Sequence, residues 1–104
     1  MYRVTTPTHT YTLPIETSNC KEILVSYRQN NVVLEKHYQD GTLPSGMTLN
    51  GNDVIVNLTQ AETKAFNKGK IDAQVRVLTN ANKAFASQIF TVTHKDVINE
   101  EILE

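Results

Sequence analysis

The sequence predicts an all-β fold, an antiparallel β-sandwich of about seven strands in a single domain. Three observations lead to this prediction. Short segments alternate between apolar and polar residues, as strands with one buried face do. Tight-turn sequences such as Asn50-Gly51 separate these segments. No segment of ordinary helix length has a helical apolar period, which excludes parallel βαβ folds because their crossovers need about a dozen residues.

The first half of the chain supplies three long strand segments. Thr5–Leu13 is rich in threonine and has prolines near its start and just after its end, a pattern typical of an edge strand. Glu22–Gln29 and Val32–Tyr38 follow, joined by Asn30-Asn31, whose residues tolerate the positive φ of a tight hairpin. We expect Lys36 to interrupt the apolar side of its strand towards the exposed end.

The middle of the chain predicts a second hairpin and one helical turn. Met47–Leu49 and Asp53–Leu58 flank an Asn-Gly pair, the strongest hairpin signal in the chain. Thr59 and Glu62 then have the spacing of a capping box, in which each side chain bonds the backbone N–H of the other residue. We therefore expect one short helical turn near residues 59–66.

The last strands form a long hairpin and define the fold more closely. Ile71–Thr79 alternates with period two, Asn80–Lys83 is a turn, and Ala84–Thr93 is the return strand. A short helical turn that leads into such a hairpin builds the corner between strands E and F of an immunoglobulin-like sandwich. The specific prediction is therefore an immunoglobulin-like β-sandwich. A small barrel is the alternative, which the lack of glycines inside the strands makes less favourable.

The alternation also predicts the core and the domain limits. The sandwich domain is expected to span residues 1–94, followed by an acidic and apolar tail at residues 95–104. The side chains that we expect inside, contributed by both sheets, are Leu13, Ile23, Val25, Leu34, Val54, Val56, Leu58, Phe66, Val75, Val77 and Phe90.

Composition and charge restrict the classes of function. The chain has 104 residues and a formal net charge of −1, so nothing in the charge favours a nucleic-acid partner. No apolar run approaches membrane-spanning length, and the first residues lack the apolar core of a signal peptide. Cys20 is the single cysteine, which favours synthesis in the cytoplasm over a disulfide-stapled secreted domain. We expect neither a membrane partner nor secretion by a signal peptide.

No residue pattern indicates catalysis or a metal site. His9, His37 and His94 lie on separate segments without paired ligand spacing, and we expect half-exposed strand histidines rather than ligands that converge in space. Cys20 has no adjacent base, so a buried or tolerated thiol is expected rather than a nucleophile. The prediction is a protein that is not an enzyme and has no cofactor, metal or catalytic residue.

The tyrosines have a structural and a functional interpretation. Tyr11, Tyr27 and Tyr38 could line a sugar-binding or peptide-binding face, but their strand positions favour inward rings whose hydroxyls reach water.

The tail is the candidate site for a protein contact. Val97, Ile98, Ile102 and Leu103 supply apolar surface among several carboxylates. A helical turn would place Ile98 and Ile102 on one face. The tail could fold back over its own sheet or fray, or it could dock on a neighbouring subunit or a particle protein.

Three segments carry a resemblance to a known group of proteins. Thr6–Pro14, Val54–Thr63 and Gln74–Thr79 resemble small uncharacterised proteins encoded in prophages of low-GC Gram-positive bacteria. Those proteins share a Thr-Pro-Thr start, a strand followed by Leu-Thr-Gln-x-x-Thr, and a Val-Arg-Val-Leu-Thr strand. The resemblance covers nearly the whole chain. It implies a phage-derived origin and a virion or assembly role, and it carries over no activity, cofactor or catalytic residue.

Two functions from different classes follow. The first is a non-enzymatic structural or assembly module of a phage particle, a sandwich that contacts copies of itself as a homo-oligomer or docks on a phage particle protein. The second is a binding module for a host protein or a carbohydrate that uses the loops at one end of the sandwich. An assembly module should associate, whereas a binding module should be a monomer with a ligand-responsive loop end.

Overall fold

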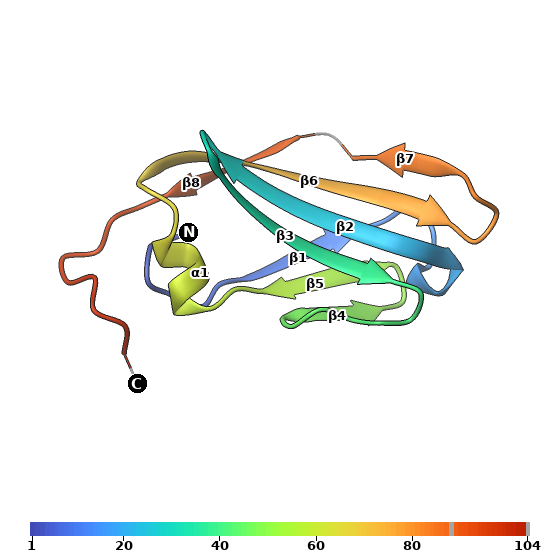
Figure 1. The fold of residues 1–104 in the computed structure, drawn as a ribbon, viewed down its shortest axis with the longest axis horizontal. Coiled ribbons are helices and arrows are strands. Elements are labelled where there is room, and N and C mark those ends of the chain that lie inside the picture. The colour runs from blue at the N-terminus through green and yellow to red at the C-terminus, as the bar shows by residue number, and fades with distance from the viewer. Residues whose placement is uncertain (88, 104) are drawn as a thin grey trace.

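Eight strands form two antiparallel sheets that pack face to face, as seen in a computed structural model that describes residues 1–87 and 89–103 (Figure 1). The fold prediction of an antiparallel sandwich with one short helical turn is confirmed, with eight described strands instead of about seven. In chain order the elements are β1 (Thr8–Thr12), a 3-10 turn (Thr17–Asn19), β2 (Cys20–Gln29), β3 (Val32–Gln39), β4 (Met47–Asn50), β5 (Asp53–Asn57), α1 (Gln60–Lys64), β6 (Gly69–Thr79), β7 (Ala84–Ala86) and β8 (Phe90–His94).

The strand order is that of an immunoglobulin-like sandwich. One sheet has the order β1-β5-β4, and the other has β3-β2-β6-β7 with β8 also paired to β6. These orders correspond to B-E-D and C′-C-F-G, with β7 and β8 sharing the place of strand G. The position of strand A, beside β1, is filled by no strand among the described residues. Tyr2 instead makes a single parallel bridge with Lys95, just after β8.

The helical turn lies between β5 and β6, at the expected corner. The Thr59 hydroxyl accepts a hydrogen bond from the backbone N–H of Glu62 at 3.1 Å, and the Glu62 carboxylate accepts one from the Thr59 N–H at 2.9 Å. The predicted capping box is therefore present. Thr63 anchors the turn to the N-terminal segment, because its buried hydroxyl accepts from the Thr5 N–H at 3.0 Å.

The core lies between the two sheets, and most of its predicted members are buried. Leu34 and Phe90 are the exceptions: Leu34 is half-buried on the edge strand β3, and Phe90 is 44% exposed on the edge strand β8. An edge strand has a neighbour on one side only, so its inward side chains keep contact with solvent. The core also contains residues outside our prediction, namely Cys20, Tyr27, Met47, Ile71 and Ala73.

The return strand of the long hairpin is broken. Arg76 pairs with Ala86 and Ala73 pairs with Phe90, so three steps along β6 are matched by four steps along the return segment. Between them Ser87 accepts a hydrogen bond from the Val75 N–H through its hydroxyl at 2.9 Å and donates its own N–H to the Val75 carbonyl at 2.8 Å. The register therefore shifts by one residue between Ser87 and Phe90, and an extra residue bends an edge strand, as a bulge does. The expectation of one continuous strand from Ala84 to Thr93 is therefore wrong.

Lys36 also departs from the prediction. Its side chain is buried, and its Nζ lies 2.6 Å from Oε2 of Glu62, so the ammonium faces α1 instead of the exposed end of the sheet. The same carboxylate closes the capping box. A buried ammonium needs such a partner, because an unpaired buried charge is costly.

Candidate functional site

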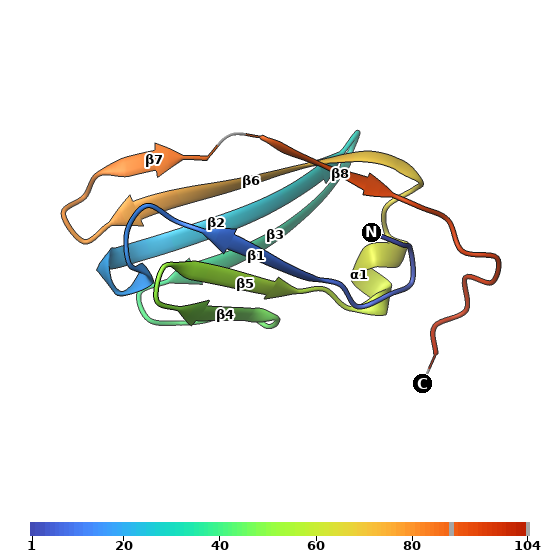
Figure 2. The ribbon, with the colours of Figure 1, turned by 180° about the vertical axis from the view of Figure 1, so that it is seen from behind.

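The C-terminal tail is held beside α1 by the side chain of Arg3. Its guanidinium donates to the Phe66 carbonyl at 2.7 Å and to the Lys64 carbonyl at 3.0 Å, at the end of α1. The same group pairs with Asp96 and with Glu100 of the tail. Arg3 thus joins the helix end to two tail carboxylates with its planar set of donors. Figure 2 shows the N-terminal segment, α1 and the start of the tail at the same end of the sandwich.

Gln60 holds the tail a second time, near its end. The side-chain amide donates to the Leu103 carbonyl at 2.7 Å, and its oxygen accepts from the Leu103 N–H at 2.8 Å. The Gln60 amide thus makes the same pair of hydrogen bonds with the Leu103 backbone that a residue of a neighbouring strand would make. Gln29 makes the same two-bond contact with the backbone of Asn67 inside the domain, at 2.7 and 2.8 Å.

These polar contacts leave the tail aliphatics facing solvent. Ile98 is fully exposed, Leu103 is 76% exposed and Ile102 is 41% exposed, whereas Val97 is half-buried. The helical turn that would place Ile98 and Ile102 on one face is not formed in the described part of the tail. The four predicted residues therefore lie along an irregular segment that is anchored by polar groups, and Ile98, Ile102 and Leu103 present apolar side chains outward.

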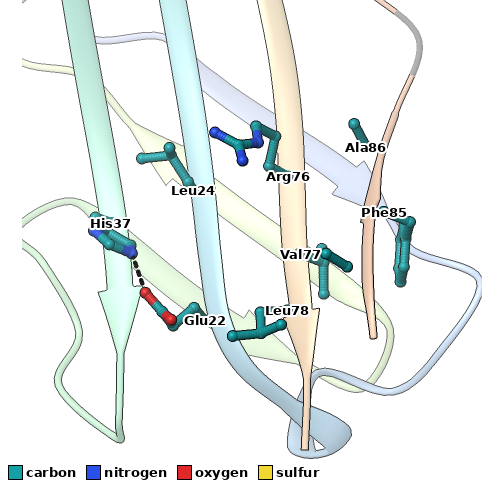
Figure 3. A pocket seen from close by; sticks show the side chains of 9 residues that line it. Glu22, Leu24, His37, Arg76, Val77, Leu78, Phe85 and Ala86 are labelled. Atoms are coloured by element: carbon teal, nitrogen blue, oxygen red, sulfur yellow. Dashed lines mark hydrogen bonds and ion pairs between the residues drawn. The ribbon is translucent and has the colours of Figure 1, made fainter. Parts of the chain in front are cut away.

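A shallow hollow lies on the outer face of the five-stranded sheet (Figure 3). Its volume is about 480 Å³, and it spans β3, β2, β6 and β7. Glu22 and His37 form a hydrogen bond across β2 and β3, with 2.9 Å between Oε1 and Nε2. Its lining is mostly apolar, with Leu24 and Leu78 joined by apolar residues of β6 and β7, and Arg76 of β6 is the cation in this lining.

The chemistry of the hollow suits binding better than reaction. Arg76 is exposed and forms no ion pair with any described residue, so its guanidinium is available to a carboxylate or phosphate. His37 already has a hydrogen-bond partner, because its Nε2 is bonded to the Glu22 carboxylate. The residues that line the hollow include no serine, threonine or cysteine that could act as a nucleophile.

A second polar cluster joins the two sheets from inside. The Tyr27 hydroxyl lies 2.8 Å from His9 Nδ1 and 2.8 Å from the Tyr11 hydroxyl. Tyr27 is completely buried, so the expectation that its hydroxyl reaches water is wrong. Burial, together with the bond to Tyr11, raises the pKa of the Tyr27 hydroxyl far above its ordinary value. Burial lowers the pKa of His9, which favours its neutral form in the folded chain. The cluster is a satisfied network between β1 and β2.

The remaining candidates lie apart from one another. His37 is exposed on β3, whereas His94 is fully buried at the end of β8, so the expectation of a half-exposed residue is wrong for His94. Its Nε2 donates to the Thr63 carbonyl at 2.8 Å, which explains why a histidine is accommodated there. Cys20 is a buried thiol at the start of β2, as expected. Within residues 1–87 and 89–103, no three His, Cys, Asp or Glu side chains gather into a metal-binding group.

Sequence reasoning missed the polar anchors of the tail and the hollow. Arg3 and Gln60 meet the tail only through the fold, and nothing in their local sequence marks them. The sequence did contain a signal for the hollow, because Leu24 and Leu78 occupy outward positions of strands whose other outward residues are polar. Two large aliphatics at outward positions indicate a partly covered or contacting face.

Comparison of the chain with protein-family models, with curated proteins and with solved structures found no match. The α1 and 3-10 segments of the described chain are both too short to cross a membrane.

Proposed function

We propose that this chain is a non-enzymatic structural or assembly module that acts through protein–protein contacts, with the tail as a principal contact. The observation that carries the proposal is the fixed tail with exposed aliphatics, above all Ile98 and Leu103. A frayed terminus would need no anchors, yet Arg3 and Gln60 hold this one at two points. Fixing an apolar segment before binding lowers the entropy that association must overcome.

The chemistry of the tail indicates its kind of partner. Lys95 is the single cation among Asp96, Glu100, Glu101 and Glu104. A partner surface should therefore combine an apolar patch with basic residues at its rim. The phage setting of the proposal rests on the resemblance of the Thr-Pro-Thr start and the Val-Arg-Val-Leu-Thr strand to prophage-encoded proteins. The partner is then a copy of this chain or a protein of the particle.

The alternative, a binding module that uses the loops at one end of the sandwich, has weaker support. The two hollows described in this structure are lined chiefly by strand residues, not by end loops. The exposed Arg76 is the observation that favours a ligand. A ligand bound by Arg76 would carry an acidic group and would lie on the outer face of the five-stranded sheet.

The test replaces tail aliphatics without removing the tail, because the Lys95 backbone bonds both Met1 and Arg3. The double variant Ile98→Ser with Leu103→Ser is compared with Leu43→Ser, which removes a 48% exposed aliphatic from the loop between β3 and β4. Light scattering should show weaker association in the tail variant and unchanged association in the control, with melting temperatures unchanged in both. Association of undiminished strength in the tail variant would contradict a contact role for the tail.

A further inference from the structure

The free edge of β1 carries unused backbone hydrogen-bonding groups. The Leu58 N–H donates to the Pro7 carbonyl at 3.1 Å, and the Leu13 N–H donates to the Asn52 carbonyl at 2.8 Å. Bonded positions alternate along an antiparallel strand, so the odd-numbered residues from 7 to 13 direct their backbone groups to β5. Thr8, Thr10 and Thr12 therefore direct their N–H and C=O groups away from the sheet. No described strand pairs with that side of β1.

This edge lacks the devices that usually protect an exposed strand. Such devices are charged side chains, a bulge, or a strand too short to pair. β3 carries Glu35 and Lys36, β4 has four residues, and the β7–β8 edge is broken at Ser87. β1 is regular over five residues and contains no lysine, arginine, aspartate or glutamate. Its three threonines and its tyrosine favour extended structure.

An apolar cleft runs beside the same edge. It has a volume of about 350 Å³ and lies between β1 and the broken return strand, with Tyr11, Leu13, Val75 and Phe90 in its lining. The Phe90 ring lies 6.0 Å from the Tyr11 ring and is 44% exposed. Ile89 beside it is 56% exposed. A strand added to β1 would cover this cleft and these side chains, a gain that backbone pairing alone would not bring.

We propose that β1 pairs antiparallel with β1 of a second copy of this chain, about a twofold axis at Thr10. The inference deepens the proposed assembly function and rests on it, because it names the second copy as a partner and β1 as the surface. In this register Thr10 faces Thr10 of the second copy, and Thr8 faces Thr12. The pairs exchange about six backbone hydrogen bonds. The two three-stranded sheets become one continuous sheet across the axis.

The sequence of β1 favours a second copy over another strand. A twofold axis at Thr10 places residue 10 against itself and residue 8 against residue 12, so a charge at position 10, or like charges at positions 8 and 12, would oppose the pairing. The outward side chains are Thr8, Thr10 and Thr12, all neutral, and Thr–Thr pairs across strands are favourable. Pro7 and Pro14 bound the strand on both sides, which limits the pairing to this short region and closes the assembly as a dimer.

The test introduces charge at the twofold axis. Thr10 is exposed, so Thr10→Lys should fold normally while placing two ammonium groups opposite each other in the dimer. Thr48→Lys is the matched control, because Thr48 and Thr10 both pair with Ile55 and lie in one row of the sheet's outer face. Light scattering should show a dissociation constant raised about tenfold or more for Thr10→Lys and unchanged for Thr48→Lys. Mixing Thr10→Lys with Thr10→Glu should restore the dimer.

Cross-linking gives a second readout that needs no charge. Oxidation of Thr10→Cys should yield a disulfide-linked dimer, whereas Thr48→Cys should not, and the native Cys20 is buried. A wild-type chain that stays monomeric, or equal behaviour of the position 10 and position 48 variants, would overturn the proposal.

The tail variants separate the two proposals. Association lost with Ile98→Ser and Leu103→Ser but kept with Thr10→Lys supports the tail contact and overturns β1 pairing, and the reverse result overturns only the tail contact.

Discussion

Glu62 makes three interactions, two through its carboxylate and one through its backbone N–H. Its carboxylate accepts from the Thr59 N–H and pairs with the buried Lys36, while its own N–H donates to the Thr59 hydroxyl. The first and third form the capping box, which sequence spacing alone predicts because the residues are three apart. The second joins β3 to α1. It could not be predicted, because local sequence does not show which strand faces the helical turn.

The capping box gives the first prediction. Thr59→Ala removes the hydroxyl that accepts from Glu62, so the free energy of unfolding should fall by about 1 kcal/mol. For a domain of this size the melting temperature should drop by about 4–8 °C. The control is Thr6→Ala, which changes an exposed threonine outside the helical turn. Equal melting temperatures for the two variants would mean that the cap does not stabilise the turn.

Buried histidines make stability depend on pH. Burial lowers the pKa of His94 below its ordinary value of 6.5, and the bond to the Thr63 carbonyl offsets this only in part. Burial likewise lowers the pKa of His9. The unfolded chain therefore takes up these protons at a higher pH than the folded chain does. This contribution to stability is complete above pH 6.5 and is lost as the pH falls towards the folded pKa.

The pH prediction is measured by urea unfolding. The midpoint concentration should fall between about pH 7.5 and pH 5.5, and His94→Gln should flatten this dependence while lowering stability at pH 7.5. Glu62 should extend the loss of folding stability to more acidic pH. Burial raises the pKa of its carboxyl, but the bonds from Lys36 and Thr59 outweigh burial and hold that pKa below its ordinary value of 4.5. A midpoint that rises on acidification from pH 7.5 would contradict this account.

At the scale of elements, turn chemistry explains which parts of the fold were predictable. Asn30-Asn31 and Asn50-Gly51 mark two hairpins, and period-two alternation places β2, β5 and β6 with the correct inward face. The split between β7 and β8 was missed because the Ser87 hydroxyl takes the place of a backbone partner. Serine in a strand gives no signal of that substitution in a single sequence.

β1 gives a prediction for amide hydrogen exchange. In dilute solution the amides of His9 and Tyr11, which face β5, should exchange slowly, whereas those of Thr8, Thr10 and Thr12 should exchange fast. At concentrations where copies pair, the three threonine amides should become protected. Protection of the threonine amides at every dilution would show that another segment of the same chain covers the edge, and absence of protection at high concentration would contradict pairing through β1.

At the scale of the whole molecule, the first residue is joined to the end of β8. The Met1 ammonium donates to the Thr93 carbonyl at 2.8 Å, and the Lys95 N–H donates to the Met1 carbonyl at 2.8 Å. The four tail residues named from the sequence do present apolar surface, with Val97 the least exposed. Their anchoring by Arg3 and Gln60 was not predictable, because it depends on the position of α1 in the finished fold.

The central claim is that this sandwich functions by associating through surfaces that its own fold leaves uncovered. Sedimentation equilibrium of the unmodified full chain over a wide range of concentration tests that claim most directly. The claim predicts a mass that rises with concentration from the 11.7 kDa of one chain to at least twice that value. A mass of 11.7 kDa at every concentration would contradict self-association through either the tail or β1.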